Sequence, residues 1–148
     1  MFKSILVPTD GSEVSTKATK QAVSIAQAMK AKIVGLHVYP EFHTVVLYEY
    51  MGPVPMMNRK EYVASAKATA ENYLSAVENA AKAAGVGYEG VIVAADRIHE
   101  AIIKAAKRKK CDLIIMASHG RTGVSGLILG SVTQKVINQC GLPVLVLR

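Results

Sequence analysis

The amino-acid sequence predicts a single α/β domain organised around a parallel sheet. Short apolar runs alternate with longer segments of helical periodicity along the 148 residues of the chain. The run Leu-Ile-Ile-Met-Ala at residues 113–117 has no polar alternation, which suits a parallel strand covered on both faces. Hydrophobic residues make up 51% of the chain, which is long enough for one sizeable core and too short to expect two. The crossovers between parallel strands are expected to be right-handed.

The chain is predicted to open with a strand, a helix and a second strand. Residues 3–9 form the first strand, and Asp-Gly-Ser at residues 10–12 then supplies turn chemistry. Ser12 is placed to cap a helix over residues 13–30, and the second strand covers residues 32–39. The helix is indicated by apolar residues at helical spacing: Val14, Ala18, Ala22, Ile25, Ala26 and Met29.

An irregular segment and a long helix follow. Glycine and prolines within residues 40–58 argue against a helix or a central strand. A loop of that length is unusual in a compact domain and is often functional. A helix is predicted over residues 59–84 and is ended by Gly85. Its inner side carries Tyr62, Val63, Ala66, Ala70, Tyr73, Leu74, Val77 and Ala81.

The rest of the chain is predicted to add three strands and two helices. Residues 88–94 form the third strand, and Asp96 opens the helix that follows it. The fourth strand at residues 113–117 leads to a short helix that begins near Ser131, and residues 142–147 form the last strand. The helix after Asp96 has an apolar stripe: Ile98, Ala101, Ile102 and Ala105.

The stretch from residue 116 to residue 131 connects the buried fourth strand to the short helix through a glycine-containing loop. Backbone N–H groups in the first turn of a helix have no partner inside the helix, so such a terminus is a good anion site. Ligands of open parallel sheets bind outside the carboxyl ends of the strands, where the strand order reverses. Asp10 follows the first strand and Ser118 the fourth, so their loops meet if these strands are neighbours. We predict that this loop holds the phosphates of a nucleotide.

The net charge of +7 includes a basic cluster at one helix end. Such a cluster can contact nucleic acid or an acidic partner. The sequence has no interleaved aromatic residues and no nucleic-acid motif, so we interpret the cluster as a solvated helix C-terminus, where cations oppose the macrodipole. No specific contact with nucleic acid is therefore predicted. The cluster consists of Lys104, Lys107, Arg108, Lys109 and Lys110.

Other sequence features indicate a cytoplasmic protein without membrane contact. No apolar stretch approaches the roughly 20 residues that a membrane helix needs. The first residues run straight into a strand and lack the layout of a signal peptide. Cys111 and Cys140 fit no metal-site spacing, so we interpret them as reduced thiols.

Several familiar nucleotide-binding and catalytic motifs are either absent or stand in the wrong structural context. Residues 85–90 match GxGxxG, but they follow a helix and enter a strand, the reverse of the dinucleotide-binding arrangement. The sequence has no GxxxxGK[ST], which excludes a P-loop NTPase, and no GxSxG surrounds Ser118. The histidines are scattered along the chain, so no metal site is predicted from them. They are His37, His43, His99 and His119.

Four segments remain as a specific combination: residues 5–12 (ILVPTDGS), 112–123 (DLIIMASHGRTG), 129–133 (LGSVT, with Val136) and 143–146 (PVLV). With this combination, the chain resembles the universal stress protein family over nearly its whole length. The resemblance implies that residues 1–148 form one domain. That domain is a three-layer sandwich with a five-stranded parallel sheet of order 3-2-1-4-5, the Rossmann-like type that binds nucleotides.

The ATP-binding members of that family carry a G-x2-G-x9-G-[S/T] signature. Its second and third glycines fall on Gly120 and Gly130 and its hydroxyl on Ser131, whereas Ala117 replaces the first glycine. An alanine methyl is tolerated if position 117 has ordinary strand dihedral angles. It obstructs the ligand if the glycine serves close backbone approach to ribose or phosphate. The resemblance implies ATP binding, with Mg²⁺ or Mn²⁺ accompanying the phosphates.

The resemblance also implies roles for individual residues. Asp10 would accept hydrogen bonds from ribose hydroxyls or help to hold the metal, besides organising its own turn. Arg121 would add positive charge, or simply be solvated. The base and ribose would be bordered by Pro8, Thr9, Val38 and Met116, of which the last two also suit plain core positions. The phosphates would be contacted by Gly120, Gly130, Ser131, Val132 and Thr133, and the binding segment also includes Ala117, Ser118 and His119.

The apolar last strand bears on how the protein assembles. Val144–Leu147 is an apolar run that would be a pairing hazard as an open sheet edge. The resemblance implies that this strand pairs with its two-fold mate in a homodimer, a contact that closes on itself. The alternative is an edge hidden by a loop of the same chain.

The function implied is that of an ATP-binding module in stress response or signalling. Bound nucleotide would order residues 118–129 and could also order residues 40–58, and a regulatory protein partner would read that surface. No general base stands in a recognisable phosphoryl-transfer motif, so we expect little intrinsic hydrolysis. One alternative is a slow ATPase or nucleotidyl enzyme. The other is a nucleotide-free interaction protein that contacts a partner through residues 40–58, whose adaptable apolar side chains are Tyr48, Tyr50, Met51, Met56 and Met57.

Overall fold

The computed structural model describes residues 1–43, 58–121 and 129–148. The adaptable side chains predicted to contact a partner, at residues 48–57, lie outside the described residues, and so does most of the loop predicted to become ordered on nucleotide binding. Strands and helices alternate along the chain as β1 (Ser4–Pro8), α1 (Glu13–Met29), β2 (Lys32–Tyr39), α3 (Arg59–Ala83), β3 (Tyr88–Ala94), α4 (Ile98–Arg108), β4 (Leu113–Ala117), α5 (Ser131–Gln139) and β5 (Val144–Leu147).

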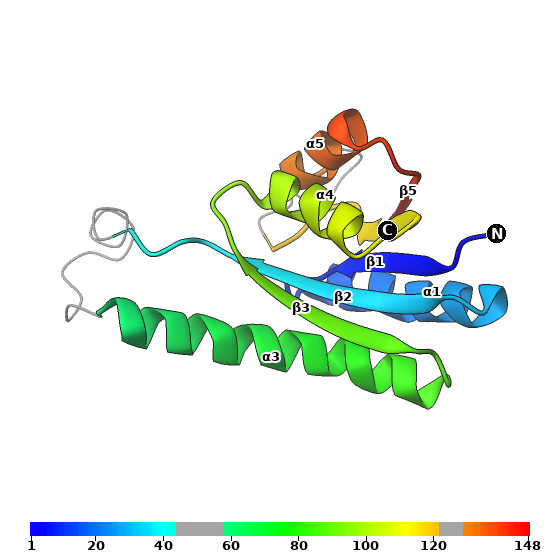
Figure 1. Ribbon diagram of the computed structural model, residues 1–148, viewed down its shortest axis with the longest axis horizontal. Helices are drawn as coiled ribbons and strands as arrows, with labels where there is room; N and C mark the ends of the chain where they lie inside the picture. Colours follow the sequence, from blue (N-terminus) through cyan, green and yellow to red (C-terminus); the bar gives the residue numbers. More distant parts are fainter. Residues whose placement is uncertain (44–57, 122–128) are drawn as a thin grey trace.

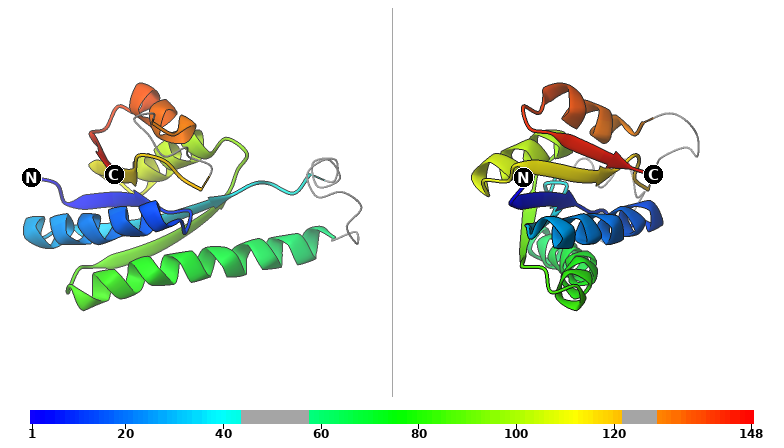
Figure 2. Two further views of the ribbon diagram at one scale, coloured as in Figure 1. Left: turned by 180° about the vertical axis from the view of Figure 1, so that it is seen from behind. Right: turned by 90° about the vertical axis from the view of Figure 1, so that its right-hand side faces the viewer.

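The strands form one five-stranded parallel sheet in the order β3-β2-β1-β4-β5. Helices α1 and α3 cover one face and α4 and α5 the other, which gives three layers (Figures 1 and 2). The predicted fold class and strand order are confirmed. Because β1 and β4 are neighbours, the loops that follow them emerge side by side at the carboxyl edge of the sheet. None of the helices in the described ranges is long and apolar enough to cross a bilayer.

The buried core lies on both faces of the central strands. Alternate residues of β1 point to opposite sides, so Ile5 packs toward α1 and α3 while Leu6 packs toward α4 and α5. All of the β4 residues are buried, as predicted for a strand covered on both faces. Because the central strands are packed on both faces, they fix the positions from which the loops at the carboxyl edge start.

Two predicted helix boundaries are confirmed by their capping contacts. The Ser12 hydroxyl accepts a hydrogen bond from the Ser15 N–H at 3.2 Å and caps α1. Gly85 follows α3 with a φ of +68°, the left-handed conformation that ends helices and that glycine adopts without strain.

Other boundaries differ from the prediction for physical reasons. Helix α1 stops at Met29 because Lys30 turns left-handed, with a φ of 55°. Asp96 does not open α4, which begins at Ile98 after the N-cap residue Arg97, whose side chain does not cap the helix. The Asp96 carboxylate instead accepts hydrogen bonds from the segment after β2. Strand β5 starts at Val144 rather than at residue 142.

Candidate functional site

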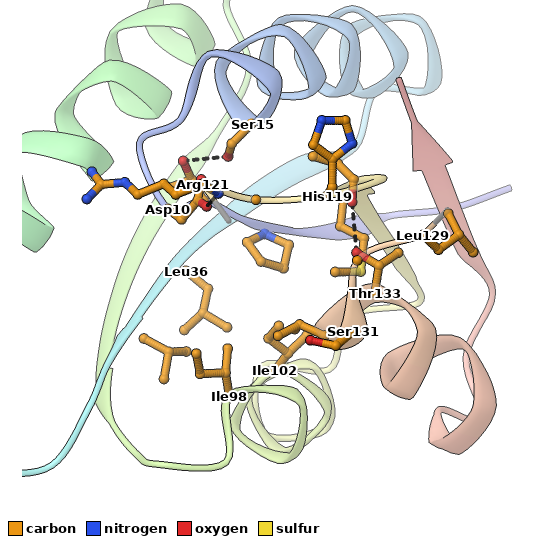
Figure 3. Close-up of a pocket in the computed structure, with 18 residues that line it drawn as sticks. Asp10, Ser15, Leu36, Ile98, Ile102, His119, Arg121, Leu129, Ser131 and Thr133 are labelled. Atoms are coloured by element: carbon orange, nitrogen blue, oxygen red, sulfur yellow. Dashed lines mark hydrogen bonds between the residues drawn. The ribbon is translucent and has the colours of Figure 1, made fainter. Parts of the chain in front are cut away.

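A cavity of about 440 Å³ opens at the carboxyl ends of β1, β2 and β4, beside the first turns of α4 and α5 (Figure 3). A volume of this size falls within the range of small-molecule sites. Most of the predicted binding residues line it: Pro8, Thr9, Asp10, Val38, Met116, Ala117, His119, Gly120, Arg121, Gly130, Ser131, Val132 and Thr133. Ser118 does not line the cavity; it is buried, and its carbonyl oxygen accepts the Gly130 N–H at 2.8 Å.

Five further residues line the cavity and were missed by sequence reasoning. They are Ser15, Leu36, Ile98, Ile102 and Leu129. Leu36 lies two residues before Val38 on the same strand, so strand alternation was a signal for placing it on the same face. Ile98 and Ile102 are one turn apart on α4, where the sequence indicates only an apolar stripe. Nothing local indicated that this stripe ends in an open cavity.

The cavity has an apolar side and a polar side. Leu36, Ile98 and Ile102 form the apolar side, and Met116 adds a sulfur-containing side chain that is 5% exposed. The polar side carries Asp10 after β1 and Ser131 at the start of α5. A cavity with these two sides can bury a planar apolar ring against one side and form hydrogen bonds with a ligand on the other.

Asp10 ties the two loops of the site together. Its Oδ1 accepts the Ser12 N–H at 3.0 Å, and its Oδ2 accepts the Arg121 N–H at 3.0 Å. Burial raises the pKa of the Asp10 carboxyl, but the hydrogen bonds from Ser12 and Arg121 and the charge of Arg121 outweigh it, so the pKa lies below the usual 3.8. The carboxylate is therefore ionised and fixed in orientation at neutral pH.

Two glycines of the signature stand where a side chain would be crowded, most severely at Gly120. A Cβ on Gly120 would lie 2.5 Å from the Asp10 Oδ2, which is shorter than real contacts of this kind. A Cβ on Gly130 would lie 3.1 Å from the Cα of His119 and 3.4 Å from the Ser118 carbonyl oxygen. Glycine at both positions allows the loop after β4 to pack against Asp10 and against the start of α5.

Ala117 ends β4 in ordinary strand conformation. It pairs with Leu147 in the parallel ladder, and the Thr133 hydroxyl donates to its carbonyl oxygen at 3.0 Å. Among the residues described, the only non-glycine residues with positive φ are Lys30 and Lys110. Position 117 therefore needs no glycine for backbone reasons, which leaves close approach of a ligand as the remaining reason for a glycine there.

The first turn of α5 faces the cavity, and no side chain of the described residues caps its N–H groups. The N-cap residue is Gly130, which has no side chain to do so, and the turn holds no acidic residue. The positive end of the helix is thus free to attract an anion. Of the two hydroxyls predicted to meet phosphate, that of Thr133 is buried and already donates to Ala117, whereas Ser131 is exposed.

The Arg121 side chain turns toward α3 rather than into the cavity (Figure 3). Its guanidinium carbon lies 4.9 Å from the centre of the Tyr73 ring, and the same group donates to the Tyr73 hydroxyl. The sequence offered two alternatives for this residue, a charge in the site or a solvated side chain, and did not indicate the contact with Tyr73. Arg121 stays at the rim, close enough to lower the pKa of Asp10.

Comparison with known proteins gives a consistent result. The sequence profile of the universal stress protein family matches residues 1–148. A universal stress protein of Thermus aquaticus is 33% identical over 149 residues, spanning all of both chains. The solved structure of protein MJ0577 of Methanocaldococcus jannaschii has a TM-score of 0.81 and 31% identity over 99% of this chain and 96% of its own. A universal stress protein solved in complex with cAMP has a TM-score of 0.68 and 25% identity, over 99% of this chain and 97% of its own.

Proposed function

The chain belongs to the universal stress protein family, and we propose that it binds an adenine nucleotide, ATP with Mg²⁺ or Mn²⁺, at the carboxyl edge of its sheet. One observation carries the proposal: a single cavity joins an apolar wall to an uncapped helix N-terminus. Adenine is flat and largely apolar, and the phosphates are anionic, so the two ends of the cavity suit the two ends of the ligand. The relative solved with cAMP supports this ligand class.

The residues of the cavity fit such a ligand in detail. Leu36, Val38 and Ile98 would bury the base, while the N–H groups of the first α5 turn and the Ser131 hydroxyl would meet the phosphates. Asp10 is the only carboxylate among the described lining residues. Each of its oxygens uses one lone pair on a backbone N–H, which leaves further acceptor sites for ribose hydroxyls or for the metal.

We propose a binding and signalling role rather than catalysis. Asp10 is a weak base because its pKa is lowered, and its oxygens already hold two loops in place. We therefore expect little intrinsic hydrolysis. The nucleotide would be the signal that a regulatory partner reads during a stress response, in the cytoplasm. Phosphate release well above background that Asp10→Asn abolishes would favour the slow ATPase instead.

The exposed edge of β5 supports a homodimer. This strand pairs with β4 on one side and ends the sheet on the other, and Leu145 is 37% exposed there. An apolar edge of this kind invites pairing with a second copy through a two-fold axis. Light scattering of the purified protein would then give twice the chain mass of 15.8 kDa. The monomer mass at micromolar concentration would rule the dimer out.

The decisive experiment measures nucleotide binding directly. Mass spectrometry of the denatured, freshly purified protein would detect bound nucleotide, and calorimetry would then titrate ATP with Mg²⁺ into emptied protein. We expect one ATP per chain with micromolar affinity. The affinity should be lost in Gly130→Val, because even a Cβ there is crowded by His119 and Ser118.

A matched glycine provides the control. A Cβ added at Gly141 would meet no atom within 4 Å beyond its chain neighbours, so Gly141→Val should bind ATP like the unaltered chain. Equal loss in both variants would point to a general effect on folding. Absence of nucleotide, of binding heat and of any shift in melting temperature with ATP would leave the nucleotide-free interaction protein as the better description.

A further inference from the structure

Three side chains able to ligate a metal meet beyond the ends of β2 and β3. Glu41 and His43 follow β2, and Asp96 follows β3. One ligand atom from each residue lies within 4.8 Å of the other two, and the His43 Nε2 is 2.6 Å from the Asp96 Oδ2. His43 and Asp96 are 53 residues apart in the sequence, so only the fold brings them together. None of these three residues lines the candidate nucleotide cavity.

The backbone that carries these side chains is anchored on several sides. Strands β2 and β3 stay paired to their last residues, and the Ala95 N–H donates to the Tyr39 carbonyl oxygen at 2.9 Å. The Tyr62 hydroxyl of α3 donates to the Pro40 carbonyl oxygen at 2.8 Å, and its ring lies 5.4 Å from that of Phe42. The ligands are therefore presented by restrained backbone, as a preorganised metal site requires.

We propose that Glu41, His43 and Asp96 form a site for a divalent metal of the zinc class. One imidazole nitrogen and two carboxylate oxygens are ligands that Zn²⁺ accepts, whereas Mg²⁺ and Ca²⁺ prefer sites made of oxygen alone. Three protein ligands leave a fourth tetrahedral position for water. All three residues are exposed, so the ion and that water have direct access from solvent.

The surroundings of the cluster suit an ion that keeps a water ligand. The Glu41 N–H donates to the Asp96 Oδ1 at 3.1 Å, which orients the carboxylate and leaves its Oδ2 facing His43. Beside the cluster, a second hollow of about 410 Å³ offers room for solvent ligands. Besides Glu41 and Asp96, its lining includes a third carboxylate and three cations: Glu100, Arg97, Lys104 and Arg108.

A metal here would connect two segments that also border the nucleotide cavity. Val38 lies just before Glu41 and His43 on one segment, and Ile98 comes two residues after Asp96 on the other. The ion would replace the direct hydrogen bond between His43 and Asp96 with bonds of about 2.0–2.2 Å to each. It would thus clamp the end of β2 to the start of α4. The metal would be held by these three side chains alone, so its binding does not depend on nucleotide binding.

Calorimetric titration of ZnCl₂ into tag-free, nucleotide-free protein tests the site. We expect one Zn²⁺ per chain with micromolar affinity and a rise in melting temperature. His43→Gln should weaken binding by more than about tenfold, because it removes the imidazole ligand. His99→Gln is the matched control, since His99 lies outside the cluster, and it should bind Zn²⁺ like the unaltered chain.

Further variants separate this site from other zinc ligands. Asp96→Asn should also weaken binding, with circular dichroism spectra showing that both ligand variants fold. Absence of Zn²⁺ binding to the unaltered chain would overturn the proposal. Binding that survives in His43→Gln and disappears in Cys140→Ser would overturn it as well, because the ion would then be held by a thiol.

Discussion

The two faces of the sheet are covered to different extents, and the difference locates the candidate nucleotide site. Helices α1 and α3, of 17 and 25 residues, cover one face, whereas α4 and α5, of 11 and 9 residues, cover the other. At 1.5 Å per residue, α3 is roughly 37 Å long and α4 roughly 16 Å. Figure 1 shows α3 extending well past the sheet while α4 and α5 stay short.

The carboxyl end of the sheet is filled on the long-helix face and hollow on the other. On the long-helix face, the Tyr73 ring of α3 lies 5.2 Å from the His37 ring of β2. On the short-helix face, Leu36, Ile102 and Met116 belong to the buried core and also line the cavity. A binding site arises here because two short helices begin beside the strand ends without covering them.

The largest difference between the faces should be in stability. Ile33 is fully buried under the long helices, so Ile33→Ala should lower the free energy of unfolding by about 3 kcal/mol. Ile98 borders the cavity and is only partly buried, so Ile98→Ala should cost about 1 kcal/mol, because its removal leaves less of a sealed void. Urea denaturation measures both. Equal losses would mean that the cavity side is packed as tightly as the other.

The second prediction concerns the glycines at the open face. Gly120→Ala should weaken ATP binding by about tenfold or more, about 1.4 kcal/mol, because its Cβ would displace Asp10 or the loop after β4. Ala117→Gly should leave the affinity within about twofold, since position 117 already has strand conformation. Calorimetry with ATP and Mg²⁺ gives both values. A tenfold gain in Ala117→Gly would show that the alanine methyl obstructs the ligand.

The smallest effect is expected at the rim, where Asp10 holds two loops. Because its folded pKa lies below 3.8, the stability that its ionised form adds is present above that pH and is lost as the pH falls through the folded value. Asp10→Asn should therefore cost about 1 kcal/mol at pH 7, the size of one hydrogen bond, and less below pH 3. Urea denaturation at both pH values gives the difference. If the difference in free energy of unfolding between the two proteins did not change with pH, the ionised Asp10 carboxylate would not be the source of the stability.

Much of the fold was predictable because its signals are local. The uninterrupted apolar run of β4 indicated a doubly covered strand, and Ser12 and Gly85 indicated the ends of two helices. Asp96 was misplaced because its carboxylate can cap a following helix or bind a distant segment, and sequence neighbours do not decide between them. Resemblance, rather than the residue pattern, supplied the strand order.

The residues in their order were enough to establish the alternation of strands and helices, the glycines of the loop after β4 and the family of the chain. Periodicity, capping and signature spacing depend on residues close together in the chain, so they can be read directly from it. Only the folded chain revealed that Leu36, Ile98 and Ile102 face an open cavity and that His43 meets Asp96. The cavity depends on how far the helices extend over the sheet, and the contact between His43 and Asp96 depends on the pairing of β2 with β3. Both are set by packing between segments distant in sequence.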